Sequence, residues 1–531
     1  MGHFNRVMKK KAEEAQLCFE DLKAQLDIKT DTKVIFYWSG KRAWQMLKSC
    51  LTQNPFPKAR VVLYYLRLKA VVRLFREEKV VQTGPAAAAL TLNSVLVNQI
   101  TELRTGKKNE HPVECDVAFA GLQLVRLYMM AYEGNEKFQQ ERCTSGMRVN
   151  NALNGSFYKY STADDRRVSF HVYYESQKSR MMKALRIAKD TKDFTMDTLK
   201  SDKVLVGQAV KALPSAEIEE LAFASGAAAC ILRTRKEWED TKVGKAVCNM
   251  PLFRLEKVAD APVKFYRNDL KKGPLSGIKV LDLTHIIAGP ACTRLLAEQG
   301  AEVTLVRRGK FQEQEQSMLE LDGWAGKRRI DLDFNHAEEL EKAKELVRNA
   351  DVVICSYQYG VFDKFGLSIE DIHKLNPNVI CGTMMCFSDS EWRERPGWAP
   401  LAEDITGLSI RNGSLEKPKN LNGVPLDYIP GFLLACGIMK ALTLSMTEGG
   451  AYNVTASLTR AGYWLHECTD LCNRGNIKDF TSIVKKGESR EIWNKVRHLV
   501  QDTAVGTVMF PAPAVYQENS VDAIQNMKFL D

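Results

Sequence analysis

The sequence predicts an α/β protein built on a doubly wound parallel sheet, accompanied by a small α+β region and a helix-rich segment. The main observation is that, from residue 275 onward, short apolar runs alternate with helical segments in the rhythm of β-α-β units. The 531 residues are 45% hydrophobic and 26% charged, which is ordinary for a globular protein and excludes a fibrous or disordered chain. This length allows two to four domains.

The front of the chain reads as mostly helical. Residues 1–30 form a polar amphipathic pattern, and 84–108 form an Ala-rich pattern that predicts a buried helix ending at a basic Gly turn. Residues 34–38 and 59–75 supply further apolar segments, and 113–132 is typical of another apolar helix.

A polar stretch at 133–155 marks the first boundary. Beyond it, residues 157–174 predict a β-hairpin turning at Asp164 and Asp165, and a later charged helix is expected to be capped by Ser215. We therefore expect four regions, listed here with their bounds: a helix-rich segment (1–150), a small α+β domain (151–272), the α/β domain (273–480) and a C-terminal tail (481–531).

The α/β domain begins with a buried strand at 278–284, followed by a helix that ends at Gly300. Further strands are expected at 301–309, 328–334, 350–357 and 378–385. The first strand opens onto a helix N-terminus, which suits a phosphate or carboxylate. The dinucleotide fingerprint G-x-G-x-x-G is absent because Gly289 and Pro290 stand at its place, so neither NAD nor FAD is expected.

The net charge of +10 lies entirely in the front fifth of the chain. Residues 1–110 contain 20 Lys and Arg against 10 Asp and Glu. Such an excess invites a nucleic-acid interpretation. The basic residues alternate with apolar ones, however, which favours packed helices with basic outer faces. We expect a partner surface or a phosphate-facing rim and no nucleic acid.

The cysteines and the first residues of the chain indicate the cellular compartment and whether a metal site is expected. The 13 cysteines include no C-x-x-C pair, and the spacing of His466, Cys468 and Cys472 does not fit zinc, so no metal is expected. An odd number of scattered cysteines and no apolar leader predict a cytoplasmic protein. No run of about 18 apolar residues occurs, so no membrane span is expected.

Several segments then carry a specific likeness. The segments PLSGIKVLDLTHIIAGPACTRLLAEQGAEVTLV (274–306), GKRRIDLDF (326–334), ADVVICSYQYGVFDKFGL (350–367) and the stretch 425–465 follow one another in order. Together they resemble class III CoA-transferases, the CaiB/BaiF family, which includes formyl-CoA transferase and α-methylacyl-CoA racemase. The resemblance implies a Rossmann-like large domain, coenzyme A carried as an acyl-CoA substrate, and a small carboxylic acid as its partner.

The chain also contains a weak internal repeat. Residues 84–123 parallel 431–464, since each has a helix of small residues, a turn and an apolar strand-helix. The front 150 residues are therefore expected to be a degenerate half-copy of the large domain. An unrelated helical domain is the alternative. Because family members form interlocked dimers, a homodimer is one expected assembly, and the half-copy could mimic part of that pairing within one chain.

The resemblance implies a catalytic Asp nucleophile, but Arg460 stands at its place. Arginine stays protonated in proteins and cannot attack a thioester, although it can hold a carboxylate or an enolate oxygen. We therefore name Arg460, Asp427 and His285 as catalytic candidates. Asp427 could instead cap a helix, and His285 could be a packed histidine. Glu403, Asp404 and Tyr428 are further replacements.

The signal for a CoA-binding region is better preserved. A nucleotide tail carries several phosphates, so basic residues at strand exits suit it. The positions that match the family pattern, or stand where it contacts the nucleotide, are Val306, Arg307, Lys327, Arg328, Ser356, Tyr357 and Lys364.

The sequence thus favours a class III CoA-transferase-type enzyme with a site remodelled around Arg460. It moves CoA between organic acids or acts on an acyl-CoA thioester. Two alternatives stay open: a racemase or isomerase of the same fold, with Arg460 stabilising an enolate, and a non-catalytic acyl-CoA-binding protein.

Overall fold

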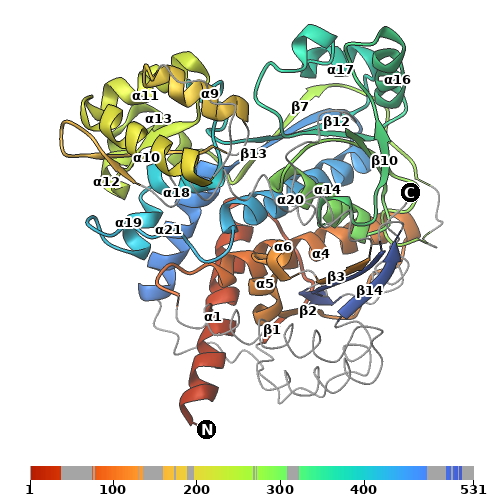
Figure 1. Cartoon of the computed structure of the whole chain (residues 1–531). Helices are drawn as coiled ribbons and strands as arrows, with labels where there is room; N and C mark the ends of the chain where they lie inside the picture. Colours follow the sequence, from red (N-terminus) through yellow and green to blue (C-terminus); the bar gives the residue numbers. More distant parts are fainter. Residues whose placement is uncertain are drawn as a thin grey trace.

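The computed structural model (Figure 1) describes most of the chain. The described residues are 2–37, 75, 78–129, 131–134, 159–172, 175–187, 196–266, 270, 272–307, 322–474, 498–503, 506–511 and 514–516. The predicted apolar segment 59–75 and the predicted boundary 133–155 lie almost wholly outside these residues.

The largest sheet has seven strands in the order β10-β9-β8-β11-β12-β13-β7. Every pair from β10 to β13 is parallel, and the edge strand β7 runs antiparallel to β13. The strands are β7 (Phe253–Ala259), β8 (Lys279–Leu283), β9 (Glu302–Arg307), β10 (Arg328–Asp331), β11 (Val352–Cys355), β12 (Ile380–Met385) and β13 (Ala451–Ser457). The predicted parallel-dominated sheet is confirmed. The antiparallel strand β7, which precedes residue 273, was not predicted.

Helices cover both faces of this sheet. Successive residues of a strand point to opposite faces, so neighbouring strand residues pack against different helices. Val280 and Ile354 pack with the helices α14 and α20, whereas Leu281 and Val353 pack with α16 and α17. These helices are α14 (Ala288–Glu298), α16 (Ala337–Arg348), α17 (Ile369–Leu375) and α20 (Pro425–Thr447). The near-continuous apolar strands of the sequence therefore reflect burial on both sides.

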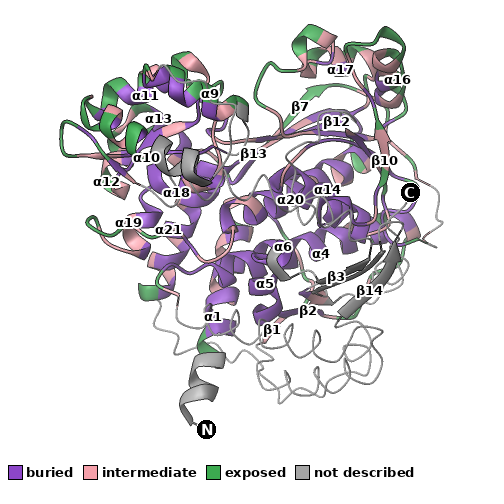
Figure 2. Ribbon diagram, in the orientation of Figure 1, coloured by how far each residue is buried: buried purple, intermediate pink, exposed green. Residues whose placement is uncertain are grey.

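Helix α20 is the central core helix. Within the described part of the chain it is the one helix long and apolar enough to cross a membrane, but 78% of its most apolar window is buried inside the protein. Figure 2 shows its burial beside α14 and α4. An all-round apolar helix is expected when neighbours surround it.

The small α+β unit contains the antiparallel sheet β4-β5-β6, covered by helices (Figure 1). Its elements are β4 (Tyr160–Ser161), β5 (Arg167–Phe170), β6 (Ala229–Ile231), α9 (Glu175–Ala184), α10 (Met196–Lys211), α11 (Ser215–Ser225), α12 (Arg235–Asp240) and α13 (Lys242–Cys248). The hairpin turns where predicted, with Asp165 at φ +54°. The prediction that Ser215 is the N-cap of a helix is wrong. Ser215 is the first residue of α11, and its amide and hydroxyl donate hydrogen bonds to Asp164.

The front of the chain packs beneath the large sheet. It contains α1 (Gly2–Gln25), β1 (Val34–Tyr37), α4 (Thr83–Thr105), β2 (Val113–Asp116), α5 (Val117–Gln123), α6 (Arg126–Met129) and β3 (Ala131–Gly134). The predicted Ala-rich helix is confirmed as α4, and it ends at Gly106 with φ +69°. The prediction of one helix over 113–132 is wrong at both ends. Its start forms β2, which pairs with β1 and β16, and its last two residues belong to β3.

Both ends of the chain meet in this front unit. The C-terminal strands β14 (His498–Thr503) and β15 (Gly506–Pro511) form a sheet with β3, and β16 (Val515–Tyr516) pairs with β2. Helix α4 lies against α20, where Asn93 Nδ2 donates to the carbonyl oxygen of Phe432 at 2.9 Å. The front unit is therefore built into the core and supports the large domain.

Candidate active site

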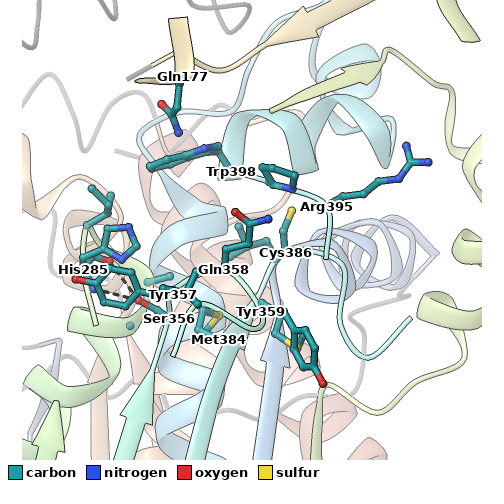
Figure 3. Close-up of a pocket in the computed structure, with 18 of the residues that line it drawn as sticks. Gln177, His285, Ser356, Tyr357, Gln358, Tyr359, Met384, Cys386, Arg395 and Trp398 are labelled. Atoms are coloured by element: carbon teal, nitrogen blue, oxygen red, sulfur yellow. Dashed lines mark hydrogen bonds between the residues drawn. The ribbon is translucent and has the colours of Figure 1, made fainter. Parts of the chain in front are cut away.

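A cavity of about 300 Å³ opens at the carboxyl ends of β8, β11 and β12 (Figure 3). This is the edge at which open α/β sheets bind ligands. The small unit closes one side through α9, and the first turn of α20 supplies another wall. The lining residues used below are Gln177, His285, Ile286, Gly289, Ser356, Tyr357, Cys386, Gly397, Trp398, Asp427 and Leu458.

Asp427 is the carboxylate of this cavity. It sits in the first turn of α20 and is half-buried. Within the described part of the chain, no group donates a hydrogen bond to its side chain. Burial, and then the charge of Glu403, raises the pKa of Asp427 to about 7. A carboxyl group that titrates near neutrality can act as an acid, a base or a nucleophile.

Glu403 lies behind Asp427, on α18 (Ala399–Ile405), and is buried. Its Oε2 accepts hydrogen bonds from Asn420 Nδ2 at 2.7 Å and from the Leu421 amide at 2.9 Å. Burial raises the pKa of Glu403 to about 7. The charge of Glu403 adds to burial in raising the pKa of Asp427.

Cys386 lies near Asp427 at the end of β12. Burial, and then the Asp427 charge, raises the pKa of its thiol well above the ordinary value, so the thiol stays protonated. A Cβ at Gly397 would lie 2.3 Å from Cys386 Sγ, so the wall tolerates only glycine there. The thiol fills space beside the carboxylate.

His285 marks the exit of β8. Its amide donates to Ser356 Oγ at 3.1 Å, and its ring stacks on Tyr357 with centroids 4.1 Å apart. Burial lowers the pKa of His285 to about 4, so the imidazole is neutral at pH 7. Its Nδ1 has no hydrogen-bond partner among the described residues.

The backbone beside His285 is strained. Ile286 adopts φ +68°, which is unusual for a β-branched residue and is found where the surroundings enforce it. A Cβ at Gly289 would lie 2.6 Å from Thr284 Cβ and 2.8 Å from Ser356 Cβ. The tight turn therefore requires glycine and brings the N-terminus of α14 to the cavity.

Arg460 does not line the cavity. It is buried in α21 (Leu458–Arg474), and its guanidinium donates to the Met250 carbonyl, to Glu467 and to Gln25. Leu458, two residues earlier, is the residue of this helix that reaches the cavity. The local geometry does not support Arg460 as a reacting group, because its guanidinium nitrogens donate hydrogen bonds to residues that do not line the cavity.

Lys327 also has a different environment from the one predicted. Its ammonium is buried and pairs with Asp282 Oδ2 at 2.8 Å, while it also contacts Thr293 Oγ1 at 2.6 Å. Burial lowers the pKa of Lys327, against the Asp282 charge. The ion pair joins β8 to the residue that precedes β10, and the Thr293 contact adds α14, so Lys327 has no access to a phosphate at the surface.

The other predicted CoA positions lie in four kinds of environment. Ser356 and Tyr357 line the cavity, and Val306 is buried in the sheet core. Arg307 lies over the Trp324 ring, with its guanidinium carbon 4.4 Å from the ring centroid. Arg328 and Lys364 are exposed. Ser356 and Tyr357 thus adjoin Asp427 and His285, whereas Arg307, Arg328 and Lys364 are not lining residues. The basic side chains that do line the cavity are those of Arg180, Arg393 and Arg395.

Sequence reasoning missed part of the cavity wall. Gln177 comes from α9 of the small unit, and Trp398 stacks on His171 with centroids 4.6 Å apart. Figure 3 shows Gln177 directed toward Trp398. Nothing in the local sequence of Gln177 singles it out.

Comparisons with known proteins match part of the chain. Residues 275–482 match the model of CoA-transferase family III, which confirms the resemblance for that segment. The chain is 32% identical over 318 residues to an acyl-CoA transferase from Gibberella moniliformis, covering 56% of this chain and 54% of that protein. It is 30% identical over 195 residues to a formyl-CoA:oxalate CoA-transferase from Rhodopseudomonas palustris, covering 35% and 46%. The chain therefore spans about half the length of these curated relatives.

Solved structures are also similar. The crystal structure of Rv3272 from Mycobacterium tuberculosis shares 24% identity, with a TM-score of 0.34 over 38% of this chain and 57% of that chain. A CaiB/BaiF family protein from Brucella suis shares 23% identity, with a TM-score of 0.32 over 44% of this chain and 65% of that chain.

Among the described residues of the present chain, no group of three or more His, Cys, Asp or Glu side chains could hold a metal ion.

Proposed function

We propose that this chain is a CoA-transferase of the class III type, which moves CoA between carboxylic acids with Asp427 as its reacting carboxylate. The observation that carries the proposal is the half-buried Asp427 in the cavity, without a hydrogen-bond donor among the described residues and with its pKa raised to about 7. Arg460 has no part in this chemistry, since its guanidinium is bound elsewhere.

The proposed cycle balances without an added proton. The Asp427 carboxylate attacks the thioester carbonyl carbon, the C–S bond breaks, and CoA leaves as a thiolate. The thiolate then attacks the Asp427 carbonyl of the mixed anhydride and releases the donor acid. The acceptor carboxylate next attacks the carbonyl carbon of the aspartyl-CoA thioester, the C–S bond breaks, and a second mixed anhydride forms as the CoA thiolate leaves. The thiolate finally attacks the acceptor's carbonyl carbon in this anhydride, which forms the acceptor's CoA thioester and releases the Asp427 carboxylate. The donors for the developing oxyanion are the amides at the α14 N-terminus.

The coenzyme would enter along the carboxyl edge of the sheet. We assign Ser356 and Tyr357 to the pantetheine end because they line the cavity. Arg307, Arg328 and Lys364 are proposed to meet the phosphates, as guanidinium and ammonium groups favour them. Lys327 and Val306 act only indirectly, through the packing of β8 and β9. No NAD or metal takes part in this proposal.

The front unit is proposed to be a degenerate half-copy of the large domain. The support is order and contact: α4, β2 and α5 follow one another as α20, β13 and α21 do, and α4 packs against α20. Such packing within one chain would replace part of a dimer interface, with a homodimer as the alternative assembly. The cytoplasmic location stays a prediction from the sequence.

The experiment is a transfer assay on the purified chain. Acetyl-CoA and formyl-CoA are offered with a panel of carboxylic acids that includes oxalate, and new CoA thioesters are measured by mass spectrometry. We expect at least one donor and acceptor pair to exchange. CoA binding without any exchange would overturn the proposal.

A racemase or isomerase is the second candidate, favoured by one observation. Neutral His285 and Asp427, with its pKa near 7, are both suited to move a proton at the α-carbon of an acyl-CoA. Deuterium from solvent appearing at that carbon, with no new thioester formed, would select this activity. A non-catalytic acyl-CoA-binding protein would show neither result.

A further inference from the structure

Residues 124–127 of the front unit hold the first turn of α20, on which Asp427 sits. The Val424 amide donates to the Leu124 carbonyl oxygen at 3.0 Å. The backbones approach so closely that a Cβ at Gly423, whose φ is +79°, would lie 2.5 Å from that oxygen. These contacts join chain segments about three hundred residues apart.

A second set of bonds reaches Tyr428, the neighbour of Asp427. The Leu127 amide donates to the Tyr428 hydroxyl oxygen at 3.2 Å, and that hydroxyl donates to Asp322 Oδ2 at 2.6 Å. Arg126 Nε donates to Asp322 Oδ1 at 2.7 Å. Arg126, Asp322 and Tyr428 are all buried, so each bond forms in a low-dielectric interior where it is strong.

The same network reaches the other helix that borders the cavity. Arg294 on α14 lies 3.7 Å from Asp322 Oδ1 and pairs with Glu298 at 2.6 Å. The first residues of α14 form the cavity wall beside His285. Asp322 therefore links the front unit to both α14 and α20.

We propose that residues 124–127 act as an N-terminal clamp that positions Asp427 through Tyr428 and Asp322. The proposal rests on the proposed function, because it takes Asp427 as the reacting carboxylate. Tyr428 and Arg126 are positioning residues, since neither lines the cavity. The clamp makes the front unit a requirement for activity, beyond its share of the core.

The test compares two buried tyrosines that each lose one hydroxyl. Tyr428→Phe removes the bonds to Asp322 and Leu127, whereas Tyr452→Phe removes a bond to the Gly449 carbonyl, remote from the cavity. Because small misplacement of a reacting group costs up to about 100-fold in rate, we expect kcat of Tyr428→Phe to fall about 10- to 100-fold. KM for the acyl-CoA should stay within about twofold.

The pH profile and hydrogen exchange separate positioning from general destabilisation. A loosened first turn admits water, so the acid limb of the kcat profile should move below pH 7 in Tyr428→Phe and stay in place in Tyr452→Phe. Amides 423–428 should exchange faster in the first variant, with 436–447 unchanged. Equal pH profiles and equal exchange in the two variants would overturn the clamp.

Two further arms keep the outcomes distinct. If Tyr428→Phe does not fold, Arg126→Lys keeps the charge beside Asp322 with a shorter reach and should show a smaller change in the same direction. If Asp427→Asn stays fully active, the proposed function fails, but the exchange of amides 423–428 still decides whether the clamp fixes this turn.

Discussion

Two aspartates near the cavity edge differ in how the fold surrounds them. Asp282, on β8, is buried and accepts hydrogen bonds from Thr284, Thr293 and Lys327. Asp427, on α20, is half-buried and receives no hydrogen bond from the described residues, while its pKa rises to about 7. A fully paired carboxylate stabilises the structure, whereas an unpaired one in a cavity is available for chemistry.

The same contrast between paired and unpaired charges applies to the residues named from the family resemblance. Lys327 and Arg460 stand where the family resemblance places binding and catalysis, yet both side chains are used within the protein. Asp427 was one of several replacements and could have been a helix cap. The three residues differ in their partners: Lys327 and Arg460 are hydrogen-bonded within the folded chain, whereas the Asp427 side chain receives no hydrogen bond from the described residues.

The largest expected effect tests Asp427 directly. Asp427→Asn removes the carboxylate nucleophile, so we expect transfer activity to fall by at least about 1,000-fold, which corresponds to about 4 kcal/mol of activation free energy. The control is Asp371→Asn, which alters an aspartate in the first turn of α17, away from the cavity. Steady-state kinetics measures both. If the two variants are equally active, Asp427 is not the reacting group.

The next effect tests Asp282 through its partner. Lys327→Met leaves a buried carboxylate without its counter-charge, so we expect the free energy of unfolding to fall by about 3–5 kcal/mol. Exposed Lys364→Met should change it by less than about 0.5 kcal/mol. Urea unfolding provides the measurement. Unchanged stability with a raised KM for the acyl-CoA would instead restore Lys327 as a phosphate contact.

A third prediction uses the pH dependence of Glu403. Its pKa is about 7 in the folded protein against an ordinary value near 4.5, so its stabilising contribution is complete at low pH and is lost as pH rises through 7. Relative to Glu403→Gln, the native chain should lose about 2 kcal/mol of stability between pH 5 and pH 8. Thermal and urea unfolding at several pH values measure it. A constant difference, like that of exposed Glu370→Gln, would contradict it.

The smallest effect concerns Arg460. Arg460→Ala removes hydrogen bonds that join α21 to α1 and to the Met250 backbone, so we expect a stability loss of about 1–2 kcal/mol. Its kcat should stay within about threefold of the native chain, because the side chain does not reach the cavity. A loss of kcat as large as that of Asp427→Asn would return Arg460 to the reaction.

The sequence by itself determined the parallel strands of the large sheet, the Ala-rich helix α4 and the edge of the sheet at which the cavity opens. Alternating and continuous apolar runs predicted the parallel strands because burial on both faces requires them. The left-handed turn after α4 followed from Gly106, and the hairpin from Asp164 and Asp165. His285 was named as a candidate because it follows the first strand of the α/β domain, and Asp427 because it begins the long helix of the family-like segment. Both line the cavity.

Only the tertiary structure decided which charges are paired. Lys327, which immediately precedes β10, meets Asp282 on β8 only in the folded chain, and Arg460 turns toward α1, more than four hundred residues earlier. The raised pKa of Asp427 depends on burial beside Glu403 from another helix. Burial and pairing are properties of segments brought together by folding, so a local pattern that predicts secondary structure could not reveal them.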